Sequence, residues 1–183
     1  MALTPDEAAD TLRDIEATGR RSGEAFGYRM SGPYFILWGL VWLVGYAGSD
    51  LLPSRAGLIW LVASLVGAIG SVAVSRTIGK NKSAQTGWRV FFLVVIVAAF
   101  VLASYTVMWP VSPMQQAAFV PLIAAGAYTA VGLWAGVRWI VAGVAIAILT
   151  LGGFFLMREH FGLYMAAVGG GGLIVAGLWM RSA

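Results

Sequence analysis

Charged residues are scarce in this chain of 183 residues: they make up 11% of it, whereas 60% belongs to the hydrophobic set. A soluble domain of this size carries about 25% charged residues, because its surface must bind water. The apolar residues here come in runs of about 20, the length of helix that crosses roughly 30 Å of hydrocarbon. The composition therefore excludes an ordinary soluble domain and predicts a protein that crosses a membrane several times.

Cysteine is absent and there is a single histidine, His160. Without thiolates the chain has no disulfide framework, thiolate zinc site, iron–sulfur cluster or cysteine nucleophile. Ionisable residues are also missing from the predicted spans, where they usually mark proton relays or ion sites. Hydroxyl groups such as those of Ser104 and Thr150 have no base in their own span to activate them. We therefore expect no enzyme, no catalytic residue, no cofactor and no metal site.

Six apolar segments are long enough to be membrane-spanning helices. Lipid offers no hydrogen-bond partner to an open backbone, so each segment should be helical. This predicts an all-α fold in two parts, a cytoplasmic N-terminal segment at 1–29 and a transmembrane bundle at 30–183. The six predicted spans cover residues 30–48, 56–75, 90–109, 117–136, 139–157 and 161–180.

The basic residues predict the orientation of the bundle. With a cytoplasmic N-terminus, ten of the twelve Lys and Arg residues fall on the cytoplasmic side, and Arg55 and Arg158 fall outside. Cytoplasmic loops carry such an excess of basic residues. We therefore expect a multi-pass protein of the plasma (inner) membrane with both termini in the cytoplasm. The net charge of +4 comes from basic residues beside the apolar runs. We therefore expect the lipid bilayer as a partner and no binding of nucleic acid.

The N-terminal segment has the pattern of a short amphipathic helix. Thr4, Pro5 and Glu7 form a capping-box sequence, and the helix should end at Gly19. Ala8, Leu12 and Ile15 form a narrow apolar stripe at helical spacing. The stripe either packs on the cytoplasmic loops of the protein or docks a partner, which is a cytoplasmic protein or a second protomer.

Aromatic residues recur every four positions in the first span, at Tyr34, Trp38, Trp42 and Tyr46. On one helix face they either line a cavity for a hydrophobic or aromatic ligand, or form a packing seam or a lipid-facing surface. In the last span four glycines occur together, at Gly169, Gly170, Gly171 and Gly172. They favour a very close helix crossing, and a flexible gate is the alternative.

Small residues at helical spacing in the other spans, such as Gly143 with Ala147, let helices approach closely. We expect this close packing either within the bundle or between the subunits of a homo-oligomer.

Two functions remain open for a membrane protein of this kind. The first is a regulatory or structural membrane component that acts through protein contacts at its cytoplasmic face. The second is a facilitative channel or a ligand-binding transport subunit for a small uncharged or hydrophobic solute.

Overall fold

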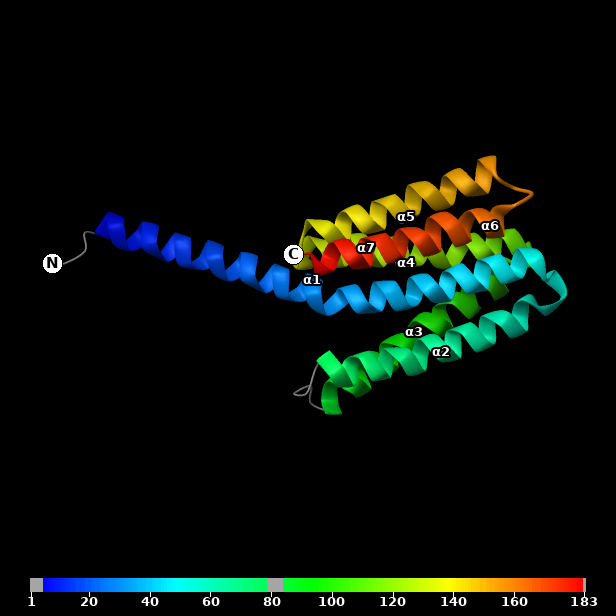
Figure 1. The fold of residues 1–183 in the computed structure, drawn as a ribbon, viewed down its shortest axis with the longest axis horizontal. Coiled ribbons are helices and arrows are strands. Elements are labelled where there is room, and N and C mark those ends of the chain that lie inside the picture. The colour runs from blue at the N-terminus through cyan, green and yellow to red at the C-terminus, as the bar shows by residue number, and fades with distance from the viewer. Residues whose placement is uncertain (1–4, 79–83, 183) are drawn as a thin grey trace.

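The computed structural model of the protein describes residues 5–78 and 84–182, and these residues contain helices and no strand. Five long helices precede a last helix that is divided by a π-helical turn (Figure 1). The elements are α1 (Pro5–Leu51), a 3-10 turn (Pro53–Arg55), α2 (Ala56–Ile78), α3 (Ala84–Val107), α4 (Pro113–Ala135), α5 (Val137–Leu156), α6 (Phe161–Met165), the π turn (Ala166–Gly170) and α7 (Gly171–Arg181).

Five helical segments of the described chain are long and apolar enough to cross a membrane. The predicted all-helical bundle with several membrane-length helices is thereby confirmed, and it indicates a membrane protein. In α3 the apolar stretch among the described residues, Val95–Val107, is shorter than a span. The sixth span remains a prediction. The five segments are Arg21–Leu51, Pro53–Thr77, Pro113–Ala135, Val137–Leu156 and Phe161–Arg181.

The first helix differs from the prediction, because it does not end at Gly19 but continues without a break from Pro5 to Leu51. A glycine ends a helix by taking a positive φ. Gly136 is the one glycine of the described residues that does so. At 1.5 Å per residue, α1 is about 70 Å long. Its N-terminal part projects beyond the bundle, at the end where the C-terminus lies (Figure 1).

The inner part of α1 packs against the π turn and α7 through glycines on both sides of the contact. A Cβ atom added at Gly177 would lie 2.7 Å from the carbonyl oxygen of Gly32, and one at Gly170 would lie 2.9 Å from that of Gly39. Real Cβ atoms essentially never come so close to backbone. The two backbones therefore touch at these crossings, and only glycine fits. In membranes such close approach replaces the hydrophobic effect as the force that joins helices.

The π turn keeps these contacts in register. On α1 the contacting carbonyl groups belong to Tyr46, Gly39 and Gly32, seven residues apart. On the opposite helix the contacts fall at Gly162, Gly170 and Gly177, so that the first interval is one residue longer than the second. A π turn inserts one extra residue into an α-helix, and this one lies within the longer interval. It returns Gly162 to the face that meets α1.

The α4–α5 hairpin turns at a single residue, Gly136, with φ of +108°. The predicted spans 117–136 and 139–157 leave Val137 and Arg138 between the two helices, but α5 already begins at Val137, so the predicted start of this span is two residues too late. An L side chain is strained at this φ, which is why glycine occupies the position. Close packing also holds the hairpin, because a Cβ atom at Gly143 would lie 2.7 Å from the backbone nitrogen of Thr129.

The start of α4 carries a capping box that sequence reasoning missed. The Ser112 hydroxyl accepts a hydrogen bond from the Gln115 N–H, at 3.2 Å, and the Gln115 side chain accepts one from the Ser112 N–H, at 2.8 Å. The signal was present as serine, proline and a glutamine at the third helical position. The predicted capping box at Thr4 lies outside the described residues.

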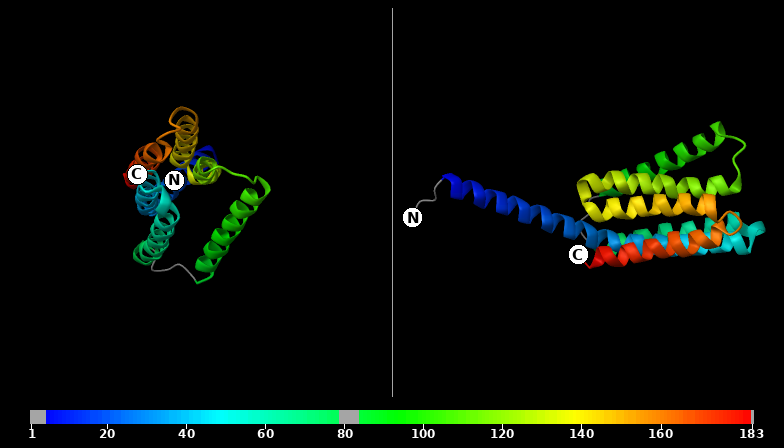
Figure 2. Two further views of the ribbon diagram at one scale, coloured as in Figure 1. Left: turned by 90° about the vertical axis from the view of Figure 1, so that its right-hand side faces the viewer. Right: turned by 90° about the horizontal axis from the view of Figure 1, so that it is seen from above.

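Helix α3 stands at the edge of the assembly, away from α1 and α7 (Figure 2). Near its C-terminal end the Tyr105 ring packs on Phe119 of α4, with ring centres 5.5 Å apart. The Tyr105 hydroxyl donates a hydrogen bond to the carbonyl oxygen of Gln116, at 3.0 Å. Apolar side chains in the middle of α3, such as Ile96 and Phe100, are exposed. These contacts fasten α3 to α4 at the end opposite the projecting part of α1.

Candidate functional site

The projecting part of α1 leaves the bundle at Tyr28, which is 5% exposed. Its hydroxyl accepts a hydrogen bond from the backbone N–H of Arg138, at 3.3 Å, in the first turn of α5. The Arg138 guanidinium lies 5.3 Å from the Tyr28 ring centre and 4.9 Å from that of Trp179 in α7. It also donates a hydrogen bond to the Trp179 carbonyl oxygen. Three helices are thus joined at the base of the projection.

Beyond this base, α1 exposes large apolar side chains. Leu12 is 59% exposed, Ile15 63% and Phe26 66%. The Ala8 side chain, which the sequence places on the same stripe, lies outside the described residues. Phe26 was not among the predicted docking residues, although it lies eleven positions after Ile15 and hence on the same helix face. The structure therefore extends the predicted stripe by three turns towards the bundle.

Three glycines share this face. At 100° per residue, Gly19, Gly23 and Gly27 fall with Leu12, Ile15 and Phe26 inside an arc of about 120°. A Cβ atom added at any of the three glycines would meet nothing within 4 Å. We call this surface, made of Leu12, Ile15, Gly19, Gly23, Phe26 and Gly27, the outer face of α1. It is a face with low relief that is apolar apart from Glu16, whose position falls inside the same arc, and no described part of the chain covers it.

Figure 1 shows the end of α2, the start of α5 and the end of α7 at the end of the bundle from which α1 projects, and each of these helix ends carries a basic residue. Arg76 lies in the last turn of α2, and Arg181 lies in the last turn of α7. Arg138 begins α5 at the same end. The opposite end holds Arg55, after α1, and Arg158, after α5. The outer face of α1 therefore begins where the basic residues of the bundle are concentrated.

The four aromatic residues of the predicted stripe lie within the bundle, and they line none of the three prominent cavities among the described residues. Trp42 and Tyr46 are buried, and their ring centres are 6.0 Å apart. The Tyr46 hydroxyl donates a hydrogen bond to the Ala117 carbonyl oxygen, at 2.6 Å. The Trp38 indole N–H donates one to the Ser71 hydroxyl, at 3.3 Å. Tyr34 is partly buried. Apart from Tyr34, each packs on or bonds to a neighbouring residue.

The four consecutive glycines divide into two pairs. Gly169 and Gly170 end the π turn and face α1, where a Cβ atom at Gly169 would lie 3.4 Å from the Trp42 ring. Gly171 and Gly172 begin α7, and a Cβ atom there would meet nothing within 4 Å. The first pair therefore forms the close helix crossing that the sequence favours, whereas the second pair makes no close contact.

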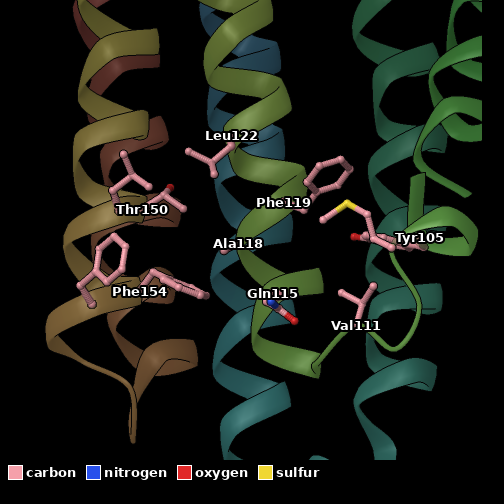
Figure 3. Close-up of a pocket in the computed structure, with 11 residues that line it drawn as sticks. Tyr105, Val111, Gln115, Ala118, Phe119, Leu122, Thr150 and Phe154 are labelled. Atoms are coloured by element: carbon pink, nitrogen blue, oxygen red, sulfur yellow. The ribbon is translucent and has the colours of Figure 1, made fainter. Parts of the chain in front are cut away.

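A cavity of about 200 Å³ lies between α3, α4 and α5 (Figure 3). Its polar lining residues are already used inside the protein, since Tyr105 bonds to Gln116 and Gln115 caps α4. The Thr150 hydroxyl is the exception: it is fully buried and has no hydrogen-bond partner. The remaining lining side chains are apolar, so that the cavity suits a small apolar molecule. They are Met108, Val111, Ala118, Phe119, Leu122, Leu151, Phe154 and Phe155.

Comparison with known proteins finds no matching family, no similar curated protein and no similar solved structure.

Proposed function

We propose that the protein is a non-enzymatic component of the plasma (inner) membrane that acts through protein contacts on the outer face of α1. The observation that carries the proposal is a helix that is held at Tyr28 and whose next face, largely apolar, has no neighbour among the described residues. In proteins a helix gains most of its stability from the packing of an apolar face, and each glycine costs the helix roughly 1 kcal/mol relative to alanine. Burial of the face by a protein partner would offset this cost.

The proposed partner is a cytoplasmic protein or a second copy of the chain. The basic residues at this end of the bundle support a cytoplasmic location for both termini. A flat glycine-containing face also supports helix docking, because small residues let another helix approach closely. In this account the bundle anchors the projecting helix in the membrane and sets its direction.

Removal of residues 1–18 tests this proposal. The bundle should keep its melting temperature in detergent, because the deleted residues precede the anchor at Tyr28. The truncated protein should lose its partner or change its oligomer mass. Leu12→Asp with Ile15→Asp should have the same effect, since burial of each side chain is worth about 1.5–3 kcal/mol. Asp14→Asn, on the opposite side of the helix, is the control. Unchanged partners, oligomer mass and cellular phenotype in all variants would contradict the proposal.

The cavity between α3, α4 and α5 supports a second candidate, a binding subunit for a small apolar solute. Its apolar lining and the unpartnered Thr150 hydroxyl are the observations that favour it. Phe119→Trp should fill the cavity and abolish solute binding without affecting partner capture by α1. Retention of the solute by a folded Phe119→Trp variant would exclude this site.

A further inference from the structure

A second and larger cavity runs along the surface between α1 and α2. Its volume is about 550 Å³, within the range of sites for small molecules and lipids. Buried Val41 and Ala63 form its floor, and the more exposed Leu40, Val44 and Val62 form its walls. We call this the α1–α2 groove. It is separate from the outer face of α1, since it lies on the membrane-spanning part of the molecule.

The length of the groove matches one leaflet of a bilayer. On α2 it extends from Arg55, just before the helix, to Val66. Eleven residues at 1.5 Å each span about 16 Å, and half of a typical hydrocarbon core is about 15 Å. The groove thus begins at the end of the bundle opposite the termini and stops near its middle. This is the depth occupied by one acyl chain of a lipid in that leaflet.

Arg55 is the one charged residue among the described residues that line the groove, and it lies at the mouth. No described carboxylate forms an ion pair with it. Asp50, five residues earlier, is occupied elsewhere, because its carboxylate accepts a hydrogen bond from the Leu163 N–H, at 2.9 Å. An exposed guanidinium therefore stands at the level of the lipid headgroups, at the end of an apolar channel. Guanidinium groups bind phosphate oxygens in charge-assisted, often bidentate, hydrogen bonds.

We propose that the α1–α2 groove binds an anionic phospholipid, with one acyl chain along Leu40, Val44 and Val62 and the headgroup at Arg55. Charge complementarity selects the headgroup, and the apolar floor and walls select a lipid over a free phosphate. The bound chain would cover the seam between α1 and α2, which are otherwise joined by close packing. Trp60 lies over Gly45 there, and Ile59 lies over Gly48. The site does not depend on which side of the membrane this end faces.

The test is lipid retention by the purified full-length protein. The protein is reconstituted in vesicles of equal parts phosphatidylglycerol and phosphatidylcholine, extracted in mild detergent and analysed by native mass spectrometry. One phosphatidylglycerol should be retained in preference to phosphatidylcholine. Arg55→Gln should lower this retention about fivefold, the effect of losing one basic residue near a membrane surface. Arg158→Gln removes the same charge at the same end outside the groove, and it should retain the lipid. Equal retention by the two variants would overturn the proposal and leave only lipids bound around the whole protein.

A second pair of variants tests the acyl chain. Ala63→Phe fills the floor of the groove and should remove both lipids, whereas Ile69→Phe places the same ring on an exposed position of α2. Retained lipid in a folded Ala63→Phe protein would overturn the proposed location. A change of oligomer mass without any change in lipid would identify the groove as a protein interface and would also overturn it. If Ala63→Phe does not fold, the comparison of the two arginine variants decides alone.

Discussion

The two parts of α1 contain similar residues in opposite surroundings. From Tyr28 to Leu51, glycines such as Gly32 and Gly39 lie against the backbone of α7 and the π turn. Before Tyr28, Gly19, Gly23 and Gly27 have no atom within 4 Å of an added Cβ, and Leu12 and Phe26 are exposed. The inner part therefore builds the bundle. The outer part has the surface of a helix that packs, but it has no partner in the part of the chain that the structure describes.

The largest effect is expected from a change of register in the inner part. Deletion of Ile174 would rotate Gly177 by about 100° away from Gly32 and abolish folding, seen as a loss of monodisperse protein in detergent. Deletion of Val168, inside the π turn, would convert the turn to α-helix. The contacts of Gly162, Gly170 and Gly177 with α1 would then remain in place. That variant should fold. Loss of folding in both deletions would refute the role of the π turn in keeping register.

A large side chain at the crossing should have the next largest effect. A Cβ atom at position 170 would lie 2.7 Å from the Leu43 backbone nitrogen. Gly170→Leu should therefore destabilise the bundle by about 3 kcal/mol or more, measured as a fall in melting temperature. Gly171→Leu is the matched control, because position 171 is open, and its melting temperature should change little. Equal effects of the two substitutions would contradict the division of the four glycines into pairs.

Substitutions at the contact of Tyr28 with Arg138, which joins the two parts of α1 to the bundle, should have a moderate effect on stability. Tyr28→Phe removes the hydroxyl that accepts the Arg138 N–H and should cost about 1 kcal/mol. Arg138→Gln keeps that backbone N–H but removes the guanidinium contacts with the rings of Tyr28 and Trp179 and the hydrogen bond to the Trp179 carbonyl oxygen, and it should cost about 2 kcal/mol. Urea or thermal melts in detergent give both values. Arg21→Gln, on the exposed part of α1, is the control and should leave stability unchanged.

The smallest effect on stability is expected in the outer part. Gly23→Ala should favour the helix by roughly 1 kcal/mol locally and leave the melting temperature of the bundle unchanged. Gly39→Ala should lower it, because its Cβ would lie 2.8 Å from the Gly170 carbonyl oxygen. A fall of similar size in both variants would show that the outer part of α1 is packed like the inner part.

Sequence patterns predicted the helices well, because apolar runs of membrane length leave the backbone no other structure. They also favoured the close crossing at Gly170. They failed at Gly19, since a glycine ends a helix only when its φ turns positive, and the residue type alone does not determine φ. They missed the anchor of Tyr28 and Arg138, which are 110 residues apart, and the π turn, since neither leaves a local pattern. The α1–α2 groove depends on how two helices diverge in space, which residue spacing does not specify.

Site-specific photo-crosslinking from position 15 in native membranes tests the central claim most directly. A photoreactive residue in place of Ile15 should give one discrete protein adduct, with a second copy or another protein, and Leu12→Asp should abolish it. The same residue in place of Leu133, exposed on α4, should give no discrete protein adduct. The account would be contradicted if position 15 gave no adduct, or crosslinked only to the bundle of its own chain.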